Sequence, residues 1–335
     1  MTTNLPENFA WVENMKKYEG NPIIRPHGKW AADLVFNPAA IVKDDQVMLL
    51  CRCVNLADKR RGKKCWSVSS LVWARSNDGI NFELDDEPLL YPDENCKYDG
   101  GFEDPRIVYI PEEELYILTY TGVYSNEDGT LTTPALMATS KDLVNWEFHG
   151  EKFPARAVCI INRKINGKYW GYYGEGKKFI TWSTDLINWH CDGETLITPR
   201  KGHFDSGLCE GAFPPIYSDN GILFIYNGAT SVEATKEYSK KTSVWMHILI
   251  GVCILPVGFL STKTTRQKLL HAVKSLSLHR MNASSATDLL ILLFFPEDML
   301  NLKENIICIT VLVIIVSVLQ LPKVIDSPAD VKILH

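Results

Sequence analysis

Residues 138–146 read ATSKDLVNW, and this pattern of a small residue, a polar turn and an aromatic residue occurs three times. The other copies are ARSNDGINF at residues 74–82 and TWSTDLINW at residues 181–189. Up to about residue 235, short apolar and aromatic runs alternate with turn residues and show no sustained helical period. This part of the chain is therefore predicted to be all-β.

A second repeat indicates how the strands are grouped. Apolar runs end in a Tyr–Gly pattern three times, and the glycines Gly122, Gly174 and Gly228 lie about fifty residues apart. A four-stranded sheet with its turns takes roughly 40–50 residues, whereas sandwich strands return about every 10 residues. The spacing favours the blades of a β-propeller.

Composition excludes several classes of protein. The 335 residues suffice for one large domain or two, and 46% hydrophobic with 22% charged residues is ordinary for a soluble globular chain. A net charge of −5 argues against a nucleic-acid partner. Nine cysteines without C-x-x-C spacing argue against a zinc ribbon. Because residues 1–20 lack a signal-peptide pattern, we expect free thiols and a cytoplasmic location.

Several strings occur together in one order. They are NPII at 21–24, FNPAA at 36–40, LLCR at 49–52, GFEDPR at 101–106, KINGKY at 164–169, and FDS at 204–206 with a Pro–Pro pair at 214–215. Over about residues 20–230 this set resembles glycoside hydrolase family 130, the β-mannoside phosphorylases and β-mannosidases. The resemblance implies a five-bladed β-propeller with the site at one end of its central channel, in agreement with the repeats.

Asp104 is the candidate general acid. Cleavage of a glycosidic bond with inversion needs one protonated carboxyl group that donates to the leaving oxygen. The resemblance implies that Asp104 is this group and acts through a substrate hydroxyl. An isolated Glu-Asp-Pro-Arg string would more simply be a turn beside a strand.

The resemblance also implies contacts with the sugar. Asn37 can donate and accept hydrogen bonds, and Arg52 offers a rigid fork of donors to neighbouring hydroxyls. The structural alternatives are a turn at Asn37 and a surface ion pair at Arg52. The further candidates for substrate binding are Arg106, Asp205 and Tyr226.

The nucleophile decides between two reactions. A phosphorylase must hold a phosphate dianion with clustered cations, whereas a hydrolase needs a carboxylate base that deprotonates water. Arg156 aligns with a phosphate-binding lysine of the phosphorylases, while Glu175 and Glu210 fall on segments where the hydrolases carry their base. We expect an inverting hydrolase of short β-1,2- or β-1,4-mannosides. The alternatives are a phosphorylase that releases mannose 1-phosphate, and an inactive or membrane-tethered propeller.

Few further partners are expected. His27, His203 and Asp205 have no second ligand at a convincing spacing, so we expect no metal. No cofactor is expected either, apart from inorganic phosphate as co-substrate of a phosphorylase. The expected partner is a β-manno-oligosaccharide; nucleic acid and membrane are not expected, and a homo-oligomer is possible.

The chain changes character after residue 235. We divide it into a propeller domain, residues 1–235, and an atypical tail, residues 236–335, rich in Leu, Ile and Val. The apolar runs at 247–260 and 306–319 are each fourteen residues long, shorter than the roughly 20 that span a bilayer. The family's closing strings, a stretch like DPTKVLARSEKP and a final YYGAGD, are absent.

A shifted reading frame is our hypothesis for the tail. Codons built from the third base of each residue and the first two bases of the next permit the first closing string at residues 264–276 and the second at 301–314. We interpret the tail as an out-of-frame translation of the last blade. Because a propeller closes by joining its first and last blades, we expect the chain as written to fold poorly and to have little activity.

Sequencing the transcript across codons 225–320 tests this interpretation. We expect a slip of one or two bases whose repair restores both closing strings. A transcript that keeps the frame as written contradicts the interpretation and makes the tail a genuine part of the chain.

Overall fold

A computed structural model describes residue 20 and residues 22–56, 58, 68–203, 205–218, 221–229, 248–255 and 276–277. Within these residues the chain forms strands and one 3-10 helix, Pro111–Glu113, and it contains no α-helix. No helix in this part of the chain is long and apolar enough to cross a membrane. The all-β prediction is confirmed for the described residues.

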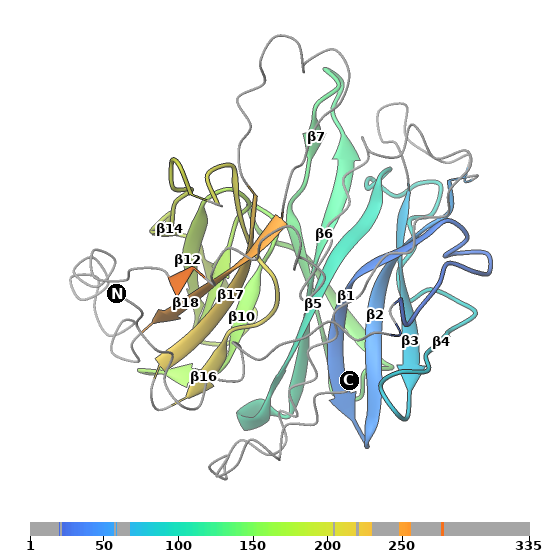
Figure 1. The fold of residues 1–335 in the computed structure, drawn as a ribbon, viewed down its shortest axis with the longest axis horizontal. Helices are drawn as coiled ribbons and strands as arrows, with labels where there is room; N and C mark the ends of the chain where they lie inside the picture. Colours follow the sequence, from blue (N-terminus) through green and yellow to red (C-terminus); the bar gives the residue numbers. More distant parts are fainter. Residues whose placement is uncertain are drawn as a thin grey trace.

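The first sheet has nine strands in two antiparallel groups. One group contains β1 (Leu34–Lys43), β2 (Gln46–Val54), β3 (Ser69–Ser76) and β4 (Glu83–Leu84). The other contains β5 (Gly101–Ile110), β6 (Leu115–Ser125), β7 (Leu131–Thr132), β8 (Ala135–Ser140) and β9 (Trp146–Phe153). A single parallel pair, Ser69 with Gly101, joins the groups. In Figure 1 strands β1–β4 lie at the right, beside β5 and β6.

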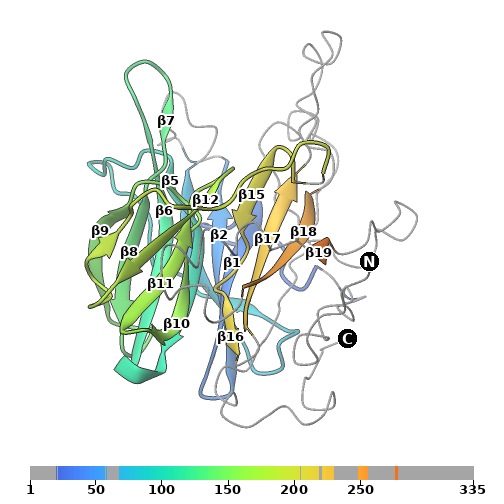
Figure 2. The same cartoon turned by 90° about the vertical axis from the view of Figure 1, so that its left-hand side faces the viewer.

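Two five-stranded sheets follow in the chain. One contains β10 (Cys159–Ile165), β11 (Lys168–Tyr173), β12 (Lys178–Ser183), β13 (Trp189–His190) and β14 (Thr195–Ile197). The other contains β15 (Leu208–Gly211), β16 (Ile216–Ser218), β17 (Gly221–Ala229), β18 (Ile248–Leu255) and β19 (Leu276–Ser277). Figure 2 shows β17–β19 on the side of the molecule opposite β8 and β9.

The nine-residue repeat forms a turn between two strands in three of the antiparallel groups. It connects β3 to β4, β8 to β9, and β12 to β13. In the second copy, Asp142 Oδ1 accepts the N–H groups of Val144 and Asn145 at 2.8 and 2.7 Å, and Oδ2 accepts the Asn145 amide at 2.7 Å. These hydrogen bonds lower the pKa of Asp142, and the bond from the Asn145 N–H has the largest effect. The repeat therefore encodes a self-capped turn.

The Tyr–Gly repeat marks the second strand of three antiparallel groups. Gly122 lies in β6, Gly174 directly follows β11, and Gly228 lies in β17. The spacing of about fifty residues therefore corresponds to one antiparallel group of strands per repeat.

Part of the tail continues the last sheet. Strand β18, Ile248–Leu255, pairs with β17 along its whole length, so this portion of the first apolar run is extended backbone. Residues 230–247, 256–275 and 278–335 lie outside the described residues, and with them the second apolar run and all of the expected frame-shifted strings except Leu276.

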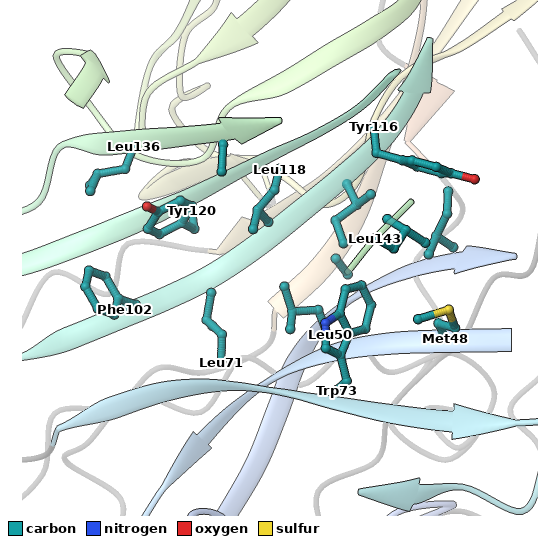
Figure 3. Packing of buried hydrophobic residues seen from close by; sticks show 14 residues of the cluster. Met48, Leu50, Leu71, Trp73, Phe102, Tyr116, Leu118, Tyr120, Leu136 and Leu143 are labelled. Atoms are coloured by element: carbon teal, nitrogen blue, oxygen red, sulfur yellow. The ribbon is translucent and has the colours of Figure 1, made fainter. Parts of the chain in front are cut away.

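A buried cluster packs the two groups of the first sheet against each other. Met48, Leu50, Leu71 and Trp73 come from β2 and β3, whereas Phe102, Leu118, Tyr120 and Leu136 come from β5, β6 and β8. Figure 3 shows these side chains filling the space between the strands. Removing this apolar area from water fixes β5 beside β1, and so it fixes the residues that the two strands carry.

Substituting Gly101 tests how tightly the two groups are joined. A Cβ atom at Gly101 (φ +84°) would lie 2.1 Å from the Ser69 carbonyl oxygen, whereas one at Gly167 (φ +75°) meets nothing within 4 Å. Both Gly→Ala variants carry a left-handed backbone cost of about 1–2 kcal/mol, and Gly101→Ala adds a steric cost of about 1–3 kcal/mol. Denaturant unfolding of the full chain should show the larger loss for Gly101→Ala. Equal losses would mean that the close approach does not constrain the fold.

Candidate active site

Two β-bulges place Asn37 and Asp104 opposite each other. The register of β1 against β2 shifts between Phe36 and Ala39, and that of β5 against β6 shifts between Glu103 and Arg106. In each bulge a residue with positive φ precedes a proline, with φ 45° at Asn37 and 48° at Asp104. Asn and Asp tolerate this conformation better than most residues, and proline needs no ladder hydrogen bond. Asn37 Nδ2 donates to Asp104 Oδ1 at 2.8 Å.

Two arginines are shared by two adjacent carboxylates. Arg52 contacts Glu103 Oε1 at 2.6 Å and Asp104 Oδ1 at 3.2 Å. Arg156 contacts Glu103 Oε2 at 2.8 Å and Asp104 Oδ2 at 3.0 Å. The Asp104 side chain is only 7% exposed, so these contacts take place almost without solvent. Arg52 is held by the Ser69 hydroxyl, to which its Nε donates at 3.0 Å.

Arg106 ties β5 to β15. Its Nε and one terminal nitrogen donate to the Gly211 carbonyl at 3.0 and 2.6 Å, and the same terminal nitrogen lies 3.4 Å from Glu210 Oε1. The other terminal nitrogen donates to the Asp104 carbonyl at 3.0 Å. The structure therefore engages Arg106, a candidate for substrate binding, in holding Glu210 and Asp104 together.

The arginines determine the charge of Asp104. Burial alone would raise the pKa of this carboxyl group, but Arg52, Arg156 and Arg106, with the Asn37 amide, outweigh burial and hold the pKa well below its usual range. Asp104 is thus ionised in the ligand-free protein. Its use as an acid requires a ligand that draws positive charge away from it.

Glu175 and Glu210 complete the cluster. Arg156 contacts Glu175 Oε2 at 3.5 Å, and the Glu175 side chain is 34% exposed. Partial burial raises the pKa of Glu175; Arg156 opposes the shift, whereas Glu210 and Asp104 add to it. Arg156 therefore touches three carboxylates. Its buried Nε has no hydrogen-bond partner among the described residues.

Asp205 and Tyr226 form a separate cluster. Arg200 Nε donates to both carboxylate oxygens of Asp205 at 3.1 and 2.9 Å, and the Tyr226 hydroxyl donates to Oδ2 at 2.9 Å. Asp205 is completely buried. These contacts fasten the segment before β15 to β17.

Sequence reasoning missed two charged residues of the site. Strict alternation would direct Glu103 away from the side that Asp104 faces, but the bulge at Asp104 brings both carboxylates to the same arginines. Lys178 is completely buried, although lysine is usually exposed and the neighbouring Lys177 is exposed, so the sequence does not indicate its burial.

The described residues contain no group of three His, Cys, Asp or Glu side chains that could hold a metal ion.

Comparison with known proteins establishes the family. The model of glycoside hydrolase family 130, described as beta-1,4-mannooligosaccharide phosphorylase, matches residues 6–245, so the chain belongs to this family of enzymes. The resemblance inferred from the sequence strings is thereby confirmed, and the match extends beyond the expected residues 20–230.

Three relatives bear on the reaction. Two proteins of Thermoanaerobacter sp. strain X514 each cover 64% of this chain and 72% of their own: a 1,2-beta-oligomannan phosphorylase, 31% identical, and a beta-1,2-mannobiose phosphorylase, 33% identical. A solved structure from work on family 130 hydrolases that target beta-1,2 mannosidic linkages in Candida mannan is 30% identical, with a TM-score of 0.62 over 72% of this chain and 76% of that one. The curated relatives favour phosphorolysis over the expected hydrolysis.

The depressed pKa of Asp104 predicts how stability depends on pH. In the unfolded chain the Asp104 carboxyl group is protonated as the pH falls through about 3.9, whereas in the folded chain it is protonated only at lower pH. The free energy of unfolding therefore rises with pH between these two pKa values. The wild type should therefore lose stability as pH falls below about 4, and Asp104→Asn should lack this part of the loss.

Urea unfolding from about pH 6 to pH 3 measures the effect. Asp86→Asn, at an exposed aspartate, is the control. If Asp104→Asn keeps the wild-type dependence on pH, the arginines do not lower the pKa of Asp104.

Proposed function

We propose that this protein is a β-mannoside phosphorylase that cleaves short β-1,2-linked manno-oligosaccharides with inversion. A phosphate oxygen bonds to C1 as the bond from C1 to the leaving oxygen breaks. The proton of Asp104 passes through a substrate hydroxyl to that oxygen. The products are α-mannose 1-phosphate and a shortened mannoside.

The position of Arg156 carries the proposal. Its guanidinium contacts Asp104 on one side and Glu175 on the other, and its side chain is 15% exposed. A planar fork of donors suits a phosphate dianion, which attacks C1 from the face opposite the leaving oxygen. Asp104 can lie near this phosphate because it reaches the leaving oxygen through a substrate hydroxyl. The names of the two curated relatives support both the reaction and the β-1,2 linkage.

The charges of the site connect phosphate binding to the state of the acid. The site contains four positive and four negative side chains. The positive ones are Arg52, Arg106, Arg156 and Lys178, and the negative ones are Glu103, Asp104, Glu175 and Glu210. A phosphate dianion that shares Arg156 weakens the field that holds Asp104 ionised. The pKa of Asp104 then rises, and the carboxyl group gains the proton that it must donate.

Hydrolysis is the second candidate. Glu175 has a raised pKa and lies near Glu210, so that either carboxylate could accept a proton from an attacking water. The solved structure from the hydrolase branch supports this alternative. The acid is Asp104 in both reactions, and only the acceptor of the mannosyl group differs.

The remaining sequence expectations accompany this proposal. We propose that the catalytic unit is a five-bladed β-propeller and that the site lies at one end of its channel. The proposed chemistry uses side chains and inorganic phosphate, without a metal or an organic cofactor, in the cytoplasm.

Turnover of β-1,2- and β-1,4-mannobiose with and without phosphate tests the proposal. The altered tail is expected to leave the full chain with little activity, but the turnover that it has should release α-mannose 1-phosphate and mannose from the β-1,2 disaccharide only when phosphate is present. Equal release of mannose without phosphate would make the protein a hydrolase. A folded chain that cleaves neither disaccharide would contradict both candidates.

The Asp104→Asn variant tests the acid. Because the amide cannot donate the proton, kcat should fall by about 10²–10⁴-fold while the variant still binds mannobiose. Asp86→Asn should keep full activity, since Asp86 is exposed and outside the site. An Asp104→Asn variant that keeps wild-type turnover would show that another group supplies the proton.

A further inference from the structure

Lys178 is hydrogen-bonded to the backbone of the two segments that carry Arg156 and Glu175. It is the first residue of β12, and its side chain is completely buried. Its ammonium donates to the Ala157 carbonyl at 3.2 Å and to the Gly174 carbonyl. Each of these carbonyls belongs to the residue next to a charged side chain of the site: Ala157 follows Arg156, and Gly174 precedes Glu175.

The backbone at both carbonyls has unusual conformations. Ala157 has a φ of 60° and Gly174 a φ of 105°, both outside the common regions for ordinary residues. The Gly174 N–H donates to the Arg156 carbonyl at 2.8 Å, which joins the two segments directly. Such a conformation persists where its surroundings fix it, and the hydrogen bonds from Lys178 supply that constraint.

Titratable groups of four elements face the ammonium. They are the charged side chains of Glu210 on β15, Arg106 on β5 and Glu175 in the turn between β11 and β12, and the thiol of Cys159 on β10, which is neutral because burial raises its pKa. Burial lowers the pKa of Lys178 to about 8, so the ammonium still carries its charge at neutral pH. A buried cation without a structural purpose is costly, and here it offsets the carboxylates of the site.

We propose that Lys178 is a positioning residue for the half of the site that receives the nucleophile. By holding the carbonyls of Ala157 and Gly174, it sets Arg156 and Glu175 at a fixed separation beside Asp104. The inference rests on the proposed function, and it applies whether the acceptor is phosphate or water, because both would approach between these side chains. Lys178 itself touches no substrate.

Lys178→Met tests the role, with Lys177→Met as the matched control at the neighbouring, exposed lysine. In the full chain, loss of the tether should lower kcat by about 10- to 100-fold and raise the KM for phosphate. The KM for mannobiose should stay within about threefold, because the carbonyls that Lys178 holds adjoin Arg156 and Glu175 and not the proposed sugar contacts Asn37 and Arg52. A purely structural defect would instead raise the KM values of phosphate and mannobiose together and lower the melting temperature.

Hydrogen exchange gives a readout that does not depend on activity. Peptides containing Gly174 should exchange faster in Lys178→Met than in the wild type or Lys177→Met, because the Gly174 N–H then loses its fixed partner. Lys178→Gln, which keeps two N–H donors, should retain more kcat than Lys178→Met; if the methionine variant fails to fold, the glutamine variant carries the test.

Two results would overturn the inference: unchanged exchange at Gly174, or equal changes in the KM values of phosphate and mannobiose. A wild-type chain without phosphorolysis but with faster exchange in Lys178→Met would refute the proposed function and leave the role of Lys178 supported.

Discussion

The shared ion pairs of Arg156 are the interaction on which the site depends. Arg156 links Glu103 and Asp104 on β5 to Glu175, which follows β11, and thereby connects two sheets through ion pairs that are buried at β5 and partly exposed at Glu175. Moving an ion out of water costs several kcal/mol unless other charges compensate it. Each member of the cluster is therefore held in place by the others. Removal of one member leaves an uncompensated charge, which explains why the cluster must form as a unit.

The fold assembles this cluster from residues on or next to the first strand of each antiparallel group, namely β1, β5, β10 and β15. β1 and β5 carry the bulges that turn Asn37 and Asp104 toward each other, while β15 carries Glu210 and receives Arg106 from β5. β10 begins three residues after Arg156, at Cys159, which lies against Gly211 of β15. The outer strands and their repeated turns complete the sheets and contain none of the charged residues in contact with Asp104.

The strands and their division into antiparallel groups could be predicted from the sequence, because each repeat depends on residues close together in the chain. The turn at residues 138–146 satisfies its own hydrogen bonds, so its residues suffice to predict it. Asp104, Arg156, Glu175 and Glu210 could be proposed only through their resemblance to a family, since they meet across sheets. Glu103 and Lys178 were missed because a bulge and complete burial depend on tertiary packing. Asp205 and Tyr226 hydrogen-bond each other, and their predicted contact with the sugar stays a prediction.

Calorimetry of phosphate binding tests the central claim most directly. Inorganic phosphate is titrated near neutral pH into the wild type and Asp104→Asn, in two buffers that differ in ionisation enthalpy. If phosphate draws Arg156 away from Asp104, the wild type takes up more protons on binding than the variant, by up to one per site. Equal proton uptake by the two proteins would contradict the account, because Asp104 would then keep its charge when the nucleophile arrives.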